Sequence, residues 1–258
     1  MRYAIGIEYN GSSFCGWQEQ SNGPSVQAEL ERAIARVADQ QVKVLGAGRT
    51  DTGVHAHCQV AHFDSGAARE SRQWVLGVNT HLPESICLLW ARKVSDDFHA
   101  RFSAVERSYR YSILNRWVRP ALDTTRLAWC RKPLDAEAMH GAAACLEGEH
   151  DFSAFRSSGC QARHAVREIT RVKVSRQGDL VHIDISANGF LYHMVRNIVG
   201  TLLLVGNREK PGNWMRRVLE SRDRKQAGVT ASSDGLYFVG VRYPAEFGIP
   251  EVEAFPAP

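Results

Sequence analysis

The chain has 258 residues, 44% of them hydrophobic and 23% charged, which is enough to bury the core of one large domain or two small ones. Its formal net charge at pH 7 is only +4, and no window reaches the ~18 continuous apolar residues that a membrane-spanning helix needs. The chain opens directly on a strand pattern without an apolar signal core, so we expect no export and a cytoplasmic location.

Strand and helix patterns alternate along the first hundred residues. Ser25 is a suitable N-cap for a helix that reaches about Ala38, because apolar side chains follow it at spacings of three and four. In a second helix, Trp74 and Val78 are expected to point inward. The predicted elements are strands at 3–9, 42–45, 58–63 and 86–94, and helices at 25–38 and 70–78.

A second block contains the same kinds of element. Asp135 is a suitable cap for its first helix, and Gly178 lies between two strand patterns that predict a hairpin. The predicted elements are strands at 108–114, 169–174, 180–185 and 236–241, and helices at 135–146, 190–205 and 214–219, the second of them strongly apolar.

These patterns predict an α+β fold made of two ferredoxin-like (RRM-like) α/β halves. We expect the halves to form a continuous mixed, mainly antiparallel sheet, with helices packed on it and a central active-site cleft. The expected division is an N-terminal half at 1–104, a C-terminal half at 105–245, and an irregular tail at 246–258, where prolines recur.

Neither the cysteines nor the histidines form a recognisable ligand set. The six cysteines contain no C-x-x-C pair, which argues against a disulfide framework or a structural zinc site. His55, His57, Cys58 and His62 lie close in sequence, but their spacing matches no standard metal site. We therefore expect reduced thiols and no metal.

The positive charge is unevenly distributed. Residues 101–132 contain eight Lys/Arg against two acids, and residues 156–176 contain six against one. Arginines interleaved with aromatic side chains such as Trp117 suit a phosphate-rich partner, although two ordinary solvated faces would have the same composition.

The most informative stretch is a glycine-rich turn at residues 46–56, which follows an apolar strand. It contains one carboxylate, Asp51, with Arg49 two residues before it. A single aspartate can act as a nucleophile or proton acceptor at a sugar or base carbon, and a nearby arginine would keep it ionised. Considered alone, an R-x-D pair is more often a turn or cap. Ordinary glycoside hydrolysis needs a second carboxylate, and none accompanies Asp51 locally.

Residues 48–56, with the sequence GRTDTGVHA, resemble the signature of the bacterial tRNA pseudouridine synthase A family. Further motifs match in the same order from about Tyr3 to Tyr243, and as an ordered set they are highly specific. They are GIEYNG and GWQ near the start, LGVN and LP, DFHARFSA, YRY, DF with FR, HMVRNIVG, and GLY near the end. The chain departs from the family pattern at Cys58, where the family often has glycine; core packing under the loop would explain this difference.

The resemblance implies an RNA uridine-to-pseudouridine isomerase that needs no cofactor and no metal. The glycosidic bond breaks, the uracil turns, and a carbon–carbon bond forms at the same sugar carbon. The implied substrate is tRNA, at positions 38–40 of the anticodon stem-loop, and the implied assembly is a homodimer without a membrane partner. The basic runs would bind tRNA backbone without reading its sequence.

The resemblance also assigns roles to five residues. Asp51 matches the catalytic nucleophile, for which attack on the sugar, attack on the base and removal of a sugar proton are all open as the first step. Arg49 would fill the space of a flipped-out uridine or bind phosphate. Tyr109 would stack on the target base, with Tyr111 as the weaker alternative, and Arg196 would pair with Asp51.

Leu236 completes the set, either as an apolar wall for the uracil or as part of the core, while His193 is expected to be structural. Three other functions stay open: the same reaction on another RNA position, an RNA-binding module with a vestigial site, and a nucleoside glycosidase. Arg49, Asp51 and Tyr109 together favour an active enzyme over a module, and the missing second carboxylate disfavours a glycosidase.

Overall fold

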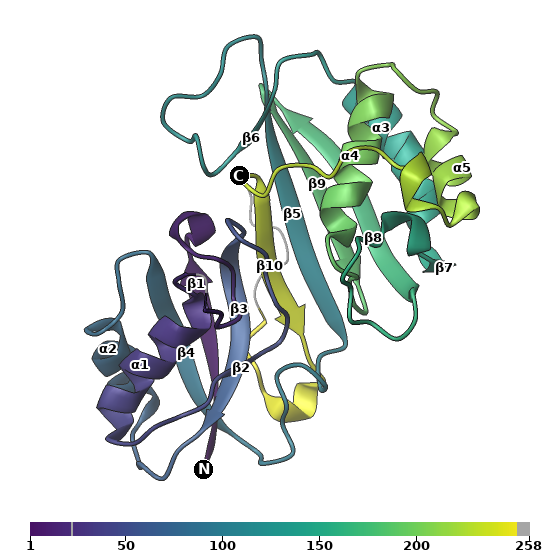
Figure 1. The fold of residues 1–258 in the computed structure, drawn as a ribbon. Helices are drawn as coiled ribbons and strands as arrows, with labels where there is room; N and C mark the ends of the chain where they lie inside the picture. The colour runs from purple at the N-terminus through teal and green to yellow at the C-terminus, as the bar shows by residue number, and fades with distance from the viewer. Residues whose placement is uncertain (22, 252–258) are drawn as a thin grey trace. The chain divides into compact units, whose positions relative to one another are not determined.

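The computed structural model describes residues 1–21 and 23–251, which form two compact units (Figure 1). The first unit contains Met1–Arg107 together with the chain from Tyr237 onward, and the second contains Ser108–Leu236. The last strand therefore packs with the first unit, whereas the division made from the sequence had grouped residues 105–245. The irregular tail was predicted at 246–258; Ala245–Phe247 forms a 3-10 turn at its start, and residues 252–258 lie outside the described residues.

The sheet of the first unit has the strand order β4-β1-β3-β10. Pairing is antiparallel between β1 and both β3 and β4, and parallel between β3 and β10, while the short β2 pairs antiparallel with β3. The strands are β1 (Arg2–Tyr9), β2 (Leu45–Gly46), β3 (His55–Asp64), β4 (Ile86–Val94) and β10 (Leu236–Arg242).

Two helices that pack side by side belong to this unit, α1 (Val26–Ala38) and α2 (Ser71–Asn79) (Figure 1). Ser25 Oγ accepts a hydrogen bond from Ala28 N at 3.2 Å, so the predicted cap of α1 is confirmed. Trp74 and Val78 are fully buried, as their spacing predicted. The apolar stripe of each helix is thus part of the core.

The strand predicted at 42–45 is wrong for all but its last residue. The backbone of Val44 bonds instead to side chains of α1: Val44 N donates to Glu31 Oε1 at 3.0 Å, and Val44 O accepts from Gln27 Nε2 at 3.1 Å. Because these side chains satisfy both backbone groups, this stretch needs no strand partner.

The second unit has the strand order β5-β9-β8-β7, with the short β6 parallel to β5. The predicted hairpin is confirmed, because β8 and β9 pair antiparallel up to Gln177 opposite Leu180. The strands are β5 (Glu106–Asn115), β6 (Ala128–Cys130), β7 (Gly148–Asp151), β8 (Val166–Gln177) and β9 (Leu180–Ala187).

Three helices pack together in the second unit, with α3 against β8 (Figure 1). They are α3 (Ala136–Ala143), α4 (Met194–Gly206) and α5 (Trp214–Ser221). Asp135 caps α3 as predicted, since its side chain accepts from Ala138 N at 3.0 Å. The predicted start of α4 at residue 190 is wrong, because His193 has a left-handed backbone (φ 59°) and forms the N-cap.

Both units combine a layer of strands with helices, and most strand pairs are antiparallel. The predicted α+β class with a mixed, mainly antiparallel sheet is confirmed. Along residues 1–21 and 23–251, no helix has the length and apolar character required to cross a membrane.

Candidate active site

Asp51 lies in the turn between β2 and β3 of the first unit. The turn begins where Ala47 N donates to Val60 O at 2.7 Å, and it ends where Val54 N donates to Asp51 O at 3.1 Å. Thr50 is buried, Asp51 is half-buried and Arg49 is exposed. A buried residue thus anchors the turn directly beside a carboxylate that solvent can reach.

The segment after β1 supports the same turn through backbone contacts. Trp17 N donates to Thr50 O at 3.0 Å, and Gly53 N donates to Phe14 O at 3.4 Å. Gly16 has φ +100°, and a Cβ there would lie only 2.5 Å from Thr50 O. This position therefore requires glycine both for its backbone conformation and for the close approach to the turn that contains Asp51.

Two polar side chains, one from β1 and one from β3, bind residues of the turn. Tyr9 Oη and Thr50 Oγ1 are 2.8 Å apart, and Gln59 Nε2 donates to Gly48 O at 2.8 Å. Burial raises the pKa of the Tyr9 phenol, so this group stays neutral. The role of these supporting residues was not predicted from the sequence, although a glutamine in the apolar strand pattern at 58–63 was a signal that the loop needed a partner there.

Cys58 belongs to the core beneath this turn and is 1% exposed. It packs in a cluster that also contains Ala47, the residue at which the turn begins. Burial raises the pKa of the thiol to about 11, so the side chain acts as a small neutral group. The departure from the family pattern is thus a matter of core packing.

Tyr109 and Tyr111 lie two residues apart on β5, in the second unit, but their environments differ. Tyr111 is 1% exposed, and its hydroxyl donates to Ser232 O at 2.9 Å. Burial also raises the pKa of the Tyr111 phenol. Tyr109 is 9% exposed and packs edge-on against Phe190, with ring centroids 5.0 Å apart. Tyr111 is therefore committed to the core, whereas Tyr109 keeps a small exposed surface.

Arg196 lies in the first turn of α4 and is half-buried. Its Nε donates to Ala231 O at 2.7 Å, and Ala231 N donates back to Arg196 O at 3.1 Å. A short segment at residues 228–231, which we call the strap, therefore fixes the guanidinium. The apolar Leu236, which follows soon after the strap, is 4% exposed at the start of β10.

Asn197, the next residue of α4, connects the strap to the rest of the unit and is fully buried. Its Oδ1 accepts from Thr230 Oγ1 at 2.7 Å and from an Arg224 guanidinium nitrogen at 3.0 Å. Its Nδ2 donates to Phe155 O at 2.8 Å and to Ser157 Oγ at 3.1 Å. The amide thus uses both ends, and it holds α4 in place beside Arg196. Its role was not predicted from the sequence, although a polar amide within an apolar helix was a signal for it.

The predicted site residues are therefore distributed over both units. Arg49 and Asp51 share one turn of the first unit, and Tyr109, Arg196 and Leu236 belong to the second. His193, which the sequence analysis expected to be structural, forms the N-cap of α4. Among the residues that the structure describes, no three His, Cys, Asp or Glu side chains gather as a metal site would require.

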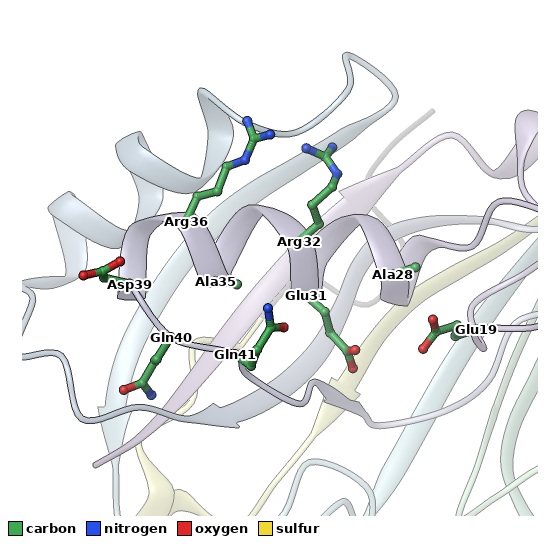
Figure 2. A pocket seen from close by; sticks show the side chains of 9 residues that line it. All are labelled: Glu19, Ala28, Glu31, Arg32, Ala35, Arg36, Asp39, Gln40 and Gln41. Carbon is green, nitrogen blue, oxygen red and sulfur yellow. The ribbon is translucent and has the colours of Figure 1, made fainter.

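A surface hollow of about 710 Å³ runs along α1 (Figure 2). Arg32 and Arg36 extend to one side of the helix, and Glu31 points to the other. Glu31 is already engaged, since it accepts from Val44 N and lies 3.4 Å from Lys43 Nζ. None of the predicted site residues lines this hollow, so we assign no chemistry to it.

Comparison with known proteins gives a consistent result. The family model described as tRNA pseudouridine synthase matches residues 5–103 and 142–244. A tRNA pseudouridine synthase A of Xanthomonas axonopodis pv. citri is 56% identical over 252 residues, which cover 97% of this chain and 98% of the relative. One of Xylella fastidiosa strain M23 is 56% identical over 251 residues, with the same coverage.

These matches define the class of the protein, which is an RNA-modifying isomerase. The turn between β2 and β3, with its single carboxylate, agrees with this class. The chain belongs to the tRNA pseudouridine synthase family. It is an enzyme that converts uridine in RNA to pseudouridine, which confirms the class of reaction inferred from the sequence.

Proposed function

We propose that this enzyme isomerises uridines at positions 38–40 of the tRNA anticodon stem-loop, with Asp51 as the nucleophile. The observation that carries the proposal is the turn at residues 47–54, which presents a half-buried carboxylate on a backbone held by two other segments. A rigidly placed acid suits a reaction that must hold one sugar while its base detaches and turns.

The reaction is balanced without a cofactor. The bond between N1 of uracil and C1′ of ribose breaks, and a bond from C5 to C1′ forms. The hydrogen on C5 leaves as a proton, and N1 gains one. Asp51 serves this exchange as the group that meets the sugar or the base.

The family resemblance assigns the other residues to the same substrate. A uridine within a stem must leave the stack before any side chain can reach it, at a cost of a few kcal/mol. We assign Arg49 to the vacated space or the adjacent phosphate, and Tyr109 to stacking on the uracil. Arg196, fixed by the strap, supplies a second cation, and Leu236 an apolar wall. The enzyme is further proposed to act as a homodimer in the cytoplasm.

Release of tritium from tRNA labelled at C5 of uridine tests the role of Asp51. Asp51→Asn should abolish release while the Kd for tRNA stays within about threefold, because the amide keeps the shape but cannot act as a nucleophile. Asp39→Asn is the matched control, because Asp39 is exposed at the end of α1, and it should keep full activity. Normal turnover by Asp51→Asn would remove Asp51 from the mechanism.

The position and the type of product are tested separately. tRNAs in which cytidine replaces uridine at 38, 39 and 40 together should release no tritium. Release that persists from such tRNAs assigns the enzyme to another RNA position. Free uracil among the products would instead identify a glycosidase, and tight binding without any reaction by the unaltered chain would identify an RNA-binding module.

A further inference from the structure

The segment between β5 and β6, residues 116–127, exposes large apolar side chains among arginines. Trp117 is 70% exposed and Leu122 is 95% exposed. Residues 116–132 contain five Lys/Arg and a single acid, Asp123. Of the two, Trp117 has a flat aromatic ring, and an exposed ring within such a charged surface is typical of a site that binds another molecule.

The Trp117 ring is covered on one side by a cation. Arg131 Cζ lies 4.4 Å from the ring centroid, which is a cation–π contact. Since the residue is still 70% exposed, the opposite face of the indole is open to solvent. A flat partner can therefore stack on the open face, and the guanidinium stays behind the ring.

The two ends of this segment are tied together, which keeps Trp117 in place. Trp129 Nε1 donates to Arg116 O at 2.9 Å. Asn115 Nδ2 donates to Cys130 O at 3.0 Å and to Lys132 O at 2.7 Å. The residues directly before the ring are thus anchored to the far end of the segment, so less conformational freedom is lost when a partner binds.

Part of the positive charge near the ring has no carboxylate partner in the described part of the chain. Arg126 lies 4.0 Å from Asp123, and Lys132 Nζ lies 2.6 Å from Glu209 Oε1. Arg131 and Arg119 have no carboxylate partner among the described residues. A polyanion would compensate this charge, whereas a neutral apolar partner would not.

We propose that Trp117, backed by Arg131, is a stacking platform for one unpaired nucleobase of the RNA substrate, whose flanking phosphates are bound by the surrounding arginines. Every nucleobase has a π face, so the contact tolerates sequence, and a base paired within a stem is already stacked and cannot use it. The inference rests on RNA being the substrate of the proposed function, but not on which uridine is converted.

Binding measurements on Trp117 variants test the platform. Trp117→Ala should raise the Kd for tRNA and the KM by between about fivefold and about a hundredfold, with kcat unchanged. Trp117→Phe, which keeps a flat ring, should stay within about threefold of the unaltered chain. Leu122→Ala is the matched control, because it truncates an even more exposed apolar side chain of the same segment, and it should change nothing.

A fully paired RNA duplex of similar length separates stacking from charge. Trp117→Ala should leave the Kd for the duplex unchanged. Arg131→Gln should reduce the slope of log K for tRNA against log salt concentration by about one. The proposal is overturned if Trp117→Ala binds tRNA as tightly as the unaltered chain does. It is equally overturned if Trp117→Ala weakens binding of the duplex as much as binding of tRNA, or if Leu122→Ala raises the Kd for tRNA as much as Trp117→Ala does. It is also overturned if Trp117→Ala changes the mass of the protein in solution, because the segment would then contact another copy of the chain. These binding measurements do not depend on which uridine is converted. They therefore test the platform even if the enzyme proves not to modify positions 38–40.

Discussion

Gly200 and Gly141 lie within helices, α4 and α3, but alanine should have opposite effects at the two positions. A glycine inside a helix costs about 1 kcal/mol relative to alanine. At Gly141 an added Cβ would meet nothing within 4 Å, so Gly141→Ala should stabilise the protein by about this amount. At Gly200 an added Cβ would lie 1.8 Å from Val229 O, a backbone atom of the strap.

The expected cost at Gly200 follows from the contacts of the strap. Ordinary contact begins at 3.4 Å, so the strap would have to retreat by roughly 1.6 Å. That movement breaks the two hydrogen bonds between Arg196 and Ala231 and the one from Gly228 N to Thr201 Oγ1. Each of these three hydrogen bonds contributes about 1 kcal/mol, and alanine regains about 1 kcal/mol in helix propensity, so the free energy of unfolding should fall by about 2 kcal/mol.

Urea denaturation followed by circular dichroism measures both variants. The midpoint should fall for Gly200→Ala and rise for Gly141→Ala, so that the two differ by about 3 kcal/mol. Because Arg196 loses its anchor, Gly200→Ala should also lower kcat in the tritium assay. Midpoints that move in the same direction would refute the close approach of the strap to α4.

Two further predictions concern buried polar groups. Burial, together with the neighbouring His99 and Arg2, lowers the pKa of His62 to about 4. The folded pKa lies below the unfolded value of ~6.5, so the contribution of neutral His62 to the free energy of unfolding is complete above pH 6.5 and is lost as the pH falls toward 4. His62→Gln should therefore reduce the loss of unfolding free energy between pH 7 and 5. An unchanged slope of unfolding free energy against pH would exclude His62 as the source of that loss. Arg110 and Asp184 form a two-bonded ion pair at 2.7 and 2.9 Å, with side chains 12% and 5% exposed. Asp184→Ala should lower the free energy of unfolding, measured by heat or urea, by about 3–5 kcal/mol, because it leaves a buried charge unpaired. The double variant Arg110→Met with Asp184→Leu should lower it much less. A loss below about 1 kcal/mol for Asp184→Ala would contradict the burial of the pair.

Local signals in the sequence predicted most elements of the fold. The cap at Ser25 and the inward pair Trp74 and Val78 depend on neighbouring residues only, and the structure reproduces them. The start of α4 was misjudged, because the apolar pattern continues through residues 190–193 although His193 takes a left-handed backbone. A hydrophobic period does not reveal such a turn.

Long-range contacts account for the rest. Nothing near Val44 in the sequence shows that Gln27 and Glu31 satisfy its backbone. In the candidate site, the glycine-rich turn and its acid could be identified from residue types. The support from Tyr9, and the fixing of Arg196 by the strap, depend on residues that are distant in the chain and that only the fold brings together.

The return of β10 to the first unit has a consequence for synthesis. β10 pairs in parallel with β3 at Tyr237 opposite His55, so the 181 residues from 56 to 236 are made between the two partners. At ~5–20 residues per second, the ribosome needs roughly 9–36 s to bridge that interval. Throughout it, the backbone of β3 near His55 is an unfilled template for a neighbouring nascent chain. The N-terminal unit of this enzyme therefore cannot complete its sheet until the second unit has been synthesised.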